Sequence, residues 1–152
     1  MSNYATENLR TLALVGHGSC GKTTLIEAML YRAGMIPEMG SIQRGTTMCD
    51  NDLLEKEVGH SIRLAVAHID TAMTDLTPVR IHILDTPGYP DYLGQDMSAL
   101  DAVKSVCAVI DPTKGPELLT RRLMAMAKER GLCRMIVINH MDDPEADLEN
   151  VA

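Results

Sequence analysis

Hydrophobic residues along this chain recur at two spacings, one typical of strands and one typical of helices. Residues 9–15, which end in the apolar run 12–15, predict a short buried strand. Apolar residues then recur at helical spacing over residues 24–33, and Gly34 provides a natural helix end. The amino-terminal part therefore predicts a strand, a short loop and a helix.

The middle of the chain has a different pattern. Periodicity fades from residue 35 to about residue 60, and connections of this length in a small domain are usually functional or disordered. Apolar and polar residues then alternate over residues 61–69 and again over residues 79–84. These two runs predict an antiparallel pair of strands joined through residues 70–78.

The last third alternates between strand and helix patterns. Residues 103–110 predict a continuous apolar strand, residues 116–130 a helix, and residues 134–138 another buried strand. Strands that alternate with helices indicate an α/β fold with a mostly parallel sheet and helices on both faces.

Composition narrows the class of protein. The chain has 152 residues, which suits one domain with a sizeable core. It contains no Phe or Trp but eleven Met, so Leu, Ile, Val and Met must fill that core. The net charge of −7 argues against broad non-specific binding to nucleic acid, and we expect no direct DNA binding.

The four cysteines form no CxxC pair, which favours reduced thiols over a disulfide framework. Cys20 lies two residues before Lys22, whose charge could lower the pKa of the thiol; an inert thiol is the favoured interpretation and a reactive one the alternative. No signal peptide or membrane-spanning apolar run is visible, so we expect a cytoplasmic protein without a membrane partner.

A glycine-rich loop between the first strand and helix has the sequence GHGSCGKT and matches the pattern GxxxxGK(S/T). In such loops the backbone N–H groups surround phosphates, Lys22 would reach the β- and γ-phosphates, and Thr23 would bind Mg²⁺. A glycine-rich turn without a ligand is the alternative. The predicted nucleotide-binding residues here are Gly16, His17, Gly18, Ser19, Cys20, Gly21, Lys22, Thr23 and Thr24.

A second candidate, DTPG at residues 85–88, follows the predicted strand at 79–84. Ligands bind at the carboxyl ends of the strands in such sheets, so this position faces the loop. Asp85 could hold Mg²⁺ through water, and the Gly88 amide could approach a γ-phosphate closely. A proline-glycine turn is the alternative interpretation.

The third candidate is NHMD at residues 139–142, after the last predicted strand. A carboxylate such as that of Asp142 can accept hydrogen bonds from the N1–H and 2-amino groups of guanine, which adenine does not offer. Capping or turn roles for Asn139 and Asp142 are the alternative.

Together these motifs resemble those of a GTPase, and longer runs are similar to one family. These runs are LALVGHGSCGKTTLIEAMLYRAG, GTTMCDNDLLEKEVGHSI, ILDTPGYPDYLG and VINHMDDPEAD. They resemble the GTP-binding domain of elongation factor G, a ribosomal translocase, over nearly the whole chain. The resemblance is closer to elongation-factor-G-like paralogues, in which Tyr also follows DTPG.

The resemblance implies a P-loop NTPase fold of the Ras-like G domain type, with GTP or GDP as ligand, Mg²⁺ as cofactor and the ribosome as partner in translation. It places switch I at about residues 35–62 and switch II at about 85–97. Ser61 would join Thr23 on Mg²⁺, although a solvent-facing serine at a strand edge is the alternative. Asn139, His140 and Asp142 would contact the base. The implied catalytic residues are Lys22, Gly88 and Tyr89.

Four residues depart from the standard factor. Tyr89 replaces a His that positions the attacking water, and a phenol keeps its proton at neutral pH, so we expect slow hydrolysis without a partner. His140 replaces a Lys whose stem covers the base, which predicts weaker nucleotide binding. Ser19 and Val58 replace an Asp and an Arg, which puts a monovalent-ion role and some ribosome-linked contacts in doubt.

The family continues beyond this sequence with a further guanine-contacting loop, a last strand and helix, and more domains. We therefore expect residues 1–152 to be a partial GTP-binding domain, with the strand at 134–138 at or near a sheet edge. Such a chain alone would not perform translocation. Two other functions stay open, namely a non-hydrolysing GTP/GDP-binding module and a P-loop phosphotransferase, which would need an acceptor site and a lid.

Overall fold

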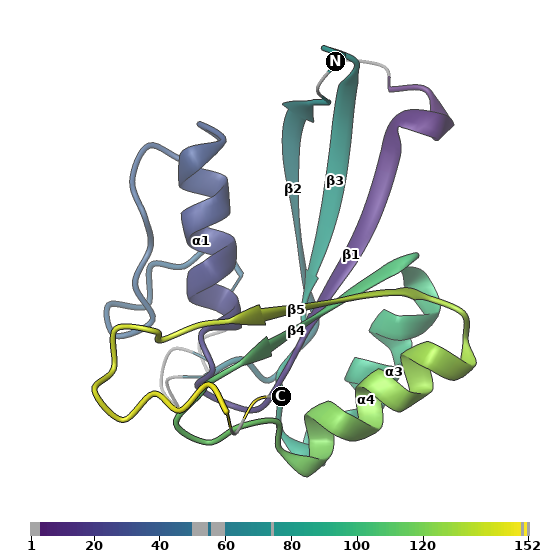
Figure 1. Cartoon of the computed structure of the whole chain (residues 1–152). Coiled ribbons are helices and arrows are strands. Elements are labelled where there is room, and N and C mark those ends of the chain that lie inside the picture. The colour runs from purple at the N-terminus through teal and green to yellow at the C-terminus, as the bar shows by residue number, and fades with distance from the viewer. Residues whose placement is uncertain (1–3, 50–54, 56–59, 74, 150, 152) are drawn as a thin grey trace.

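The computed structural model of the chain describes residues 4–49, 55, 60–73, 75–149 and 151 (Figure 1). They form a five-stranded sheet in the order β2-β3-β1-β4-β5. The strands are β1 (Leu9–Val15), β2 (Ala65–Ala72), β3 (Pro78–Asp85), β4 (Ser105–Ile110) and β5 (Cys133–Ile138). The helices are α1 (Lys22–Arg32), α3 (Leu93–Ala102) and α4 (Leu118–Glu129), with short 3₁₀ turns η1 (Thr6–Asn8) and η2 (Pro90–Tyr92).

The sheet is mostly parallel, as predicted. Strand β1 lies between β3 and β4 and runs parallel to both, and β5 continues the parallel order beyond β4. Strand β2 runs antiparallel to β3, which confirms the predicted pair of strands. The carboxyl ends of four parallel strands therefore meet at one rim of the sheet.

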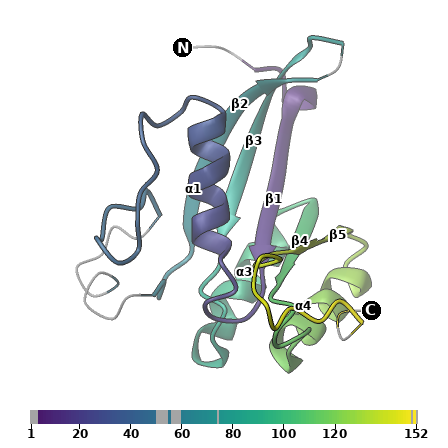
Figure 2. The ribbon, with the colours of Figure 1, turned by 60° about the vertical axis from the view of Figure 1, so that its left-hand side comes forward.

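Helices cover both faces of the sheet, as predicted. Figure 2 shows α1 on one side and α3 and α4 on the other. Alternate residues of β1 pack on opposite faces of the sheet, because successive side chains of a strand point to opposite sides. Ala13 and Val15 pack with residues of α3 and α4, whereas Leu14 packs with Ile26 and Leu30 of α1.

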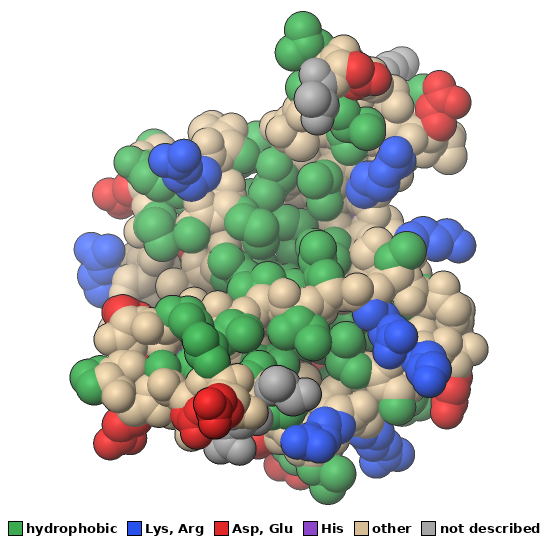
Figure 3. Space-filling view, in the orientation of Figure 1, with side chains coloured by type: hydrophobic (Ala, Val, Ile, Leu, Met, Phe, Trp, Pro, Cys, Tyr) green, Lys and Arg blue, Asp and Glu red, His purple; other side chains and the backbone are tan. Residues whose placement is uncertain are grey.

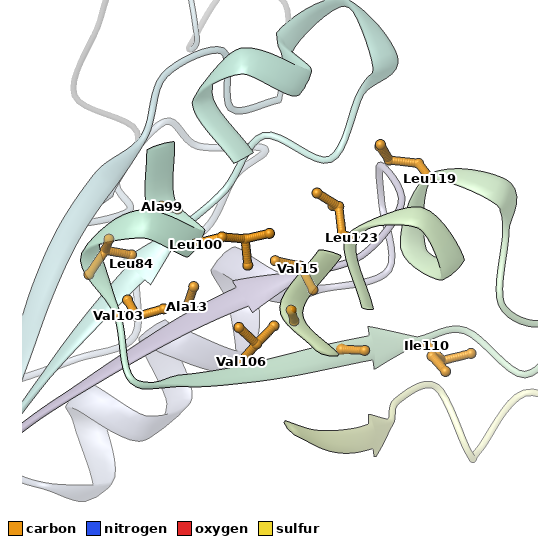
Figure 4. Packing of buried hydrophobic residues seen from close by; sticks show 12 residues of the cluster. Ala13, Val15, Leu84, Ala99, Leu100, Val103, Val106, Ile110, Leu119 and Leu123 are labelled. Atoms are coloured by element: carbon orange, nitrogen blue, oxygen red, sulfur yellow. The ribbon is translucent and has the colours of Figure 1, made fainter. Parts of the chain in front are cut away.

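The core on the α3 and α4 face is built from medium-sized aliphatic side chains. In Figure 4, Leu100 of α3 and Leu123 of α4 point toward Val15 and Val106 of the sheet. Leu123 is fully buried and Leu100 almost so. These contacts hold both helices against the strands without any Phe or Trp.

The strand predicted at residues 61–69 begins only at Ala65, so the assignment of its first four residues was wrong. In this segment the backbone amides form hydrogen bonds with side chains and not with a neighbouring strand. The amides of residues 62 and 63 donate to the Glu55 carboxylate at 2.9 and 3.0 Å, and the amide of residue 64 donates to Gln95. The hydrogen-bonded pairing of β2 with β3 therefore begins only after residue 64.

Strand β5 is not buried, contrary to the prediction for residues 134–138. Met135 is 52% exposed and Ile136 57% exposed. The strand lies at the edge of the sheet, as the resemblance implied, and no second strand pairs with it within the described residues. Figure 3 shows hydrophobic side chains gathered over β5 and beside it.

Helix α3 was not predicted. Pro90 lies shortly before it and Gly94 lies in its first turn, so the local sequence weakens the helical signal. Burial of Ala99 and Leu100 against the sheet stabilises it instead. Helix α1 begins at Lys22, earlier than predicted, and α4 is slightly shorter than its predicted range. Within the described residues, no helix has the length and apolar character needed to cross a bilayer.

Replacing Leu123 by Ala should lower the free energy of unfolding by about 2–5 kcal/mol, because a cavity would form between α4 and the sheet. Leu118, on the same helix, is 84% exposed and provides a matched control. Its replacement by Ala should change stability by less than about 0.5 kcal/mol. Urea unfolding of both variants measures this, and equal losses would contradict the assigned packing.

Candidate functional site

The loop between β1 and α1 closes tightly at its glycines. Gly21 precedes α1 with φ of 91°, a left-handed conformation that side chains other than glycine rarely adopt. A Cβ atom at this position would collide with Nδ2 of Asn139. That same amide donates to the Cys20 carbonyl at 3.0 Å. The NHMD motif is thus held directly against the glycine-rich loop.

Lys22 points back into the loop that precedes it. Its ammonium donates to the carbonyls of Gly16 at 3.1 Å and His17 at 2.9 Å, and the side chain is buried. Burying a charge is costly unless hydrogen bonds compensate. The loop therefore holds a preformed positive charge at the carboxyl end of β1.

The DTPG turn lies across the same loop because β1 and β3 are parallel neighbours. Leu14 is the register partner of Asp85, and the Thr86 hydroxyl donates to the Leu14 carbonyl at 2.8 Å. Gly88 has φ of 80°, and a Cβ atom there would collide with Nζ of Lys22. Only glycine allows this close approach to the ammonium.

Three oxygen-bearing side chains converge beside Lys22. The Thr23 hydroxyl donates to Oδ2 of Asp85 at 2.6 Å and lies 3.3 Å from the Ser61 hydroxyl. Ser61 is buried, so its alternative as a solvent-facing strand-edge serine was wrong. Hydroxyl and carboxylate oxygens suit Mg²⁺, which keeps several waters and needs few protein ligands. This donor set fits that ion.

A pocket of about 290 Å³ opens between these elements. Its lining includes the predicted residues Ser19, Gly21, Lys22, Thr23, Thr24, Ser61, Tyr89 and His140. It also includes Ile42, Gln43, His60, Thr86 and Pro87. The other predicted site residues, which do not line it, are Gly16, His17, Gly18, Cys20, Asp85, Gly88, Asn139 and Asp142. The pocket therefore joins both predicted switch regions to the loop.

Tyr89 covers one side of the loop. Its ring occupies the space that a Cβ atom on Gly18 would need, and its ring centroid lies 4.5 Å from that of His60. The phenol of switch II thus packs against both the glycine-rich loop and His60 of the predicted switch I. His17 is buried, and its Nδ1 lies 2.6 Å from the Gly18 carbonyl.

The residues of the NHMD turn differ in their surroundings. His140 has φ of 53°, and its Nδ1 lies 3.3 Å from Oδ2 of Asp111. Burial tends to raise the pKa of Asp111, but hydrogen bonds from Thr113 and His140 outweigh it and lower that pKa. Asp142 is exposed on the turn.

The Cys20 thiol is not activated by Lys22, although the ammonium does act to lower the pKa of this group. Burial raises the pKa of this thiol and outweighs the nearby ammonium. Burial likewise raises the pKa of Cys107, to about 11. Since the thiolate is the nucleophile, both side chains behave as inert packing groups.

Sequence reasoning missed Glu27 on α1. Its carboxylate is buried and accepts hydrogen bonds from the amides of Gly40 at 2.8 Å and Met48 at 2.6 Å. These bonds fasten the loop after α1 to that helix. A lone Glu in an amphipathic helix usually indicates a solvated face, so no pattern could have identified it. Val58 and the neighbouring parts of the predicted switch I lie outside the described residues.

Asp96 on α3 was also missed. It is fully buried, and within the described part of the chain neither carboxylate oxygen has a hydrogen-bond partner of good geometry. Burial raises the pKa of this group and outweighs the influence of Thr86, Lys22 and the Gly88 amide. A buried acid that lacks such bonds destabilises the fold when it is charged.

The fold and this rim define a nucleotide-binding α/β domain of the P-loop class. Residues 7–152 match the family described as the elongation factor Tu GTP binding domain, and the chain belongs to that family. A tetracycline resistance protein, TetM from transposon Tn1545 of Enterococcus faecalis, is 34% identical over 92% of this chain and 21% of its own length. Mitochondrial ribosome-releasing factor 2 of Drosophila melanogaster is 35% identical over 95% of this chain and 19% of its length.

Solved structures agree with this assignment. The crystal structure of ttk003000868 from Thermus thermophilus has a TM-score of 0.77 and 36% identity, covering 85% of this chain and 19% of that one. Bacterial selenocysteine-specific elongation factor EF-Sec has a TM-score of 0.69 and 25% identity, covering 93% of this chain and 21% of that one. The chain spans about a fifth of the length of these relatives, and it is a member of the translational GTPase family.

Replacing Asp96 by Asn should raise the free energy of unfolding by about 1 kcal/mol at pH 8. Because the folded state raises the pKa of Asp96, the charged form lowers stability above that pKa, and this penalty disappears below the pKa of the unfolded chain. The gain should therefore shrink as the pH falls toward about 4. Urea unfolding across this range measures it, with exposed Asp91→Asn, shortly before the same helix, as control. A gain independent of pH would contradict the cause.

Proposed function

We propose that this chain binds guanine nucleotides with Mg²⁺ and hydrolyses GTP to GDP and phosphate, as the partial GTP-binding domain of an elongation-factor-G-type protein. The observation that carries this proposal is the meeting of Lys22, the Thr23 and Asp85 pair, and Gly88 at one rim of the sheet. A triphosphate needs a cation, a metal site and close backbone donors in one place, and these residues would provide all of them.

The loop residues would bind the phosphates. The amides of residues 18–23 would surround the β-phosphate at the amino terminus of α1, where the helix dipole favours negative charge. Lys22 would exchange its bonds to Gly16 and His17 for phosphate oxygens. Since the ammonium is already in place, little reorganisation is required.

The three oxygen-bearing side chains would hold the metal. Thr23 and Ser61 would bind Mg²⁺ directly, and Asp85 would bind it through water. When bound, Mg²⁺ neutralises charge that develops on the phosphates. The Gly88 amide would donate to the γ-phosphate from the opposite side.

Hydrolysis would depend on positioning more than on proton transfer at a side chain. Tyr89 lies against Gly18 at the mouth of the loop, where it can shield an attacking water or hold it by a hydrogen bond. A phenol is a poor proton acceptor, which supports slow hydrolysis in the absence of a partner. Catalysis would then rest mainly on Lys22, the Gly88 amide and the metal.

Guanine would lie beside the NHMD turn. Asn139 fastens this turn to the Cys20 carbonyl, and His140 lines the pocket next to Gly21. Asp142 would accept the guanine N1–H and 2-amino hydrogens from its exposed position on the turn. A short turn held against the loop places base and phosphate recognition at a fixed separation.

The relatives suggest where this activity is used. One is named as a mitochondrial ribosome-releasing factor and another as a selenocysteine-specific elongation factor. We propose that the protein to which this domain belongs acts on the ribosome in translation elongation or a related step. Its partner would be the ribosome, and hydrolysis would release the two switch segments that the γ-phosphate and metal hold.

The second candidate is a module that binds GTP or GDP without hydrolysing it, and the packing of Tyr89 against the loop favours it. Phosphate release with and without ribosomes distinguishes the two. Stimulation by ribosomes would exclude the non-hydrolysing module, whereas no release under either condition would leave binding as the function.

Competition binding tests the proposal directly. GDP should displace a fluorescent GDP analogue at least about a hundredfold more effectively than ADP, because only guanine offers both donor groups. Equal displacement by ADP would reject the guanine site. No binding of either nucleotide would reject the proposed function as a whole.

Replacing Asp142 by Asn should weaken GDP binding by at least about tenfold, because the Nδ2 group of the new amide presents a donor to the guanine 2-amino group, which is itself a donor. Xanthosine diphosphate should gain affinity in the same variant, since its base carries an accepting oxygen in place of that amino group. Asp143→Asn, one residue further along the same turn, is the matched control and should change both affinities by less than about twofold. An unchanged preference in Asp142→Asn would remove this residue from the site.

A further inference from the structure

Residues 61–64 connect the metal side of the site to β2, and side chains hold their backbone. The amides of residues 62 and 63 donate to Glu55, as described above, and Gln95 bonds to the amide of Leu64 and the carbonyl of Ile62. Ser61, at the start of this segment, faces Thr23. Any displacement of the segment would therefore move the Ser61 hydroxyl.

Gln95 bridges two regions that lie far apart in the sequence. Its Oε1 accepts the amide of Leu64 at 2.5 Å, and its Nε2 donates to the carbonyl of Ile62 at 3.0 Å. One side-chain amide thus satisfies a donor and an acceptor on the same stretch of backbone. It replaces the neighbouring strand that this segment lacks within the described residues.

The other end of the bridge leads to the phosphate side. Gln95 lies in the first turn of α3, which follows Gly88 and Tyr89 through the short turn η2. Gly88 lies against the Lys22 ammonium, and Tyr89 lies against Gly18. A movement of Gly88 that shifts the first turn of α3 would pull on Gln95.

We propose that Gln95 is a positioning residue that couples the two halves of the nucleotide site, so that Ser61 and Gly88 adopt their nucleotide-binding positions together. This inference rests on the proposed function. Gln95 touches neither phosphate nor metal in this scheme. It transmits position through two hydrogen bonds, so that contact of a γ-phosphate with Gly88 favours the placement of Ser61.

The chemistry explains why a glutamine is needed. A carboxylate at this position could accept from Leu64 but could not donate to Ile62, and it would add a negative charge near the Glu55 carboxylate. Leucine has a similar size and offers neither bond. Gln95→Glu and Gln95→Leu therefore both interrupt the bridge, by different means.

The test combines amide hydrogen exchange with nucleotide affinity. In Gln95→Leu, exchange of the Leu64 amide should rise by about tenfold, while β1 and β3 amides exchange at wild-type rates. Affinity for a non-hydrolysable GTP analogue with Mg²⁺ should fall at least about fivefold, and GDP affinity by less than about twofold. Ser98→Ala, an exposed change on the same helix, is the control and should alter neither measurement.

Measuring the effect of Ser61→Ala in two backgrounds, the wild-type chain and Gln95→Leu, shows whether Gln95 acts through Ser61 or only supports the segment locally. Ser61→Ala should weaken binding of the analogue in the otherwise wild-type chain but have a clearly smaller effect in Gln95→Leu, because the hydroxyl is no longer positioned there. Gln95→Glu should reproduce the loss of discrimination between the analogue and GDP.

The outcomes are distinct. Faster exchange at Leu64 with an unchanged ratio of analogue to GDP affinity would overturn the coupling while leaving the proposed function intact. Equal losses for both nucleotides, or faster exchange throughout the sheet, would show a merely structural role and also overturn it. Absence of guanine nucleotide binding in the wild-type chain would overturn the proposed function and the coupling with it.

Discussion

The buried ammonium of Lys22 is the constraint on which the rest of the site depends. A charge removed from water costs several kcal/mol unless the surrounding groups compensate, at roughly the scale of the whole stability of a small domain. Here the carbonyls of Gly16 and His17 provide that compensation. They are available only because the loop turns back on itself, and Gly88 can pass over the ammonium only because it has no side chain.

The parallel order of the strands brings further side chains of the site next to Lys22. Because β1 and β3 are neighbours, Asp85 ends its strand beside the start of α1 and accepts the Thr23 hydroxyl. The loops around this rim have few ladder bonds, and single side chains hold them instead: Glu27 fastens one, and Glu55 with Gln95 fastens another. A segment held by a few side-chain bonds can be released by a local change, which suits a nucleotide-dependent switch.

Much of this could be predicted from the sequence, because periodicity and glycine-rich motifs report local requirements. The alternation of strands and helices, the helices on both faces and the loop at Lys22 follow from patterns within a few residues. The departure of residues 62–64 from the strand does not, because it depends on Glu55 and on a glutamine more than thirty residues away. Burial of Asp96 and exposure of β5 likewise depend on the tertiary arrangement, which local patterns in a single sequence do not report.

The central claim is that one rim of the sheet gathers the negative charge of a triphosphate. A crystal structure of the chain soaked with a non-hydrolysable GTP analogue and Mg²⁺ tests it most directly. The account predicts phosphate oxygens within hydrogen-bonding distance of Lys22 and the loop amides, with the metal bound by the Thr23 hydroxyl. An empty rim at saturating nucleotide, or phosphates bound elsewhere on the molecule, would contradict it.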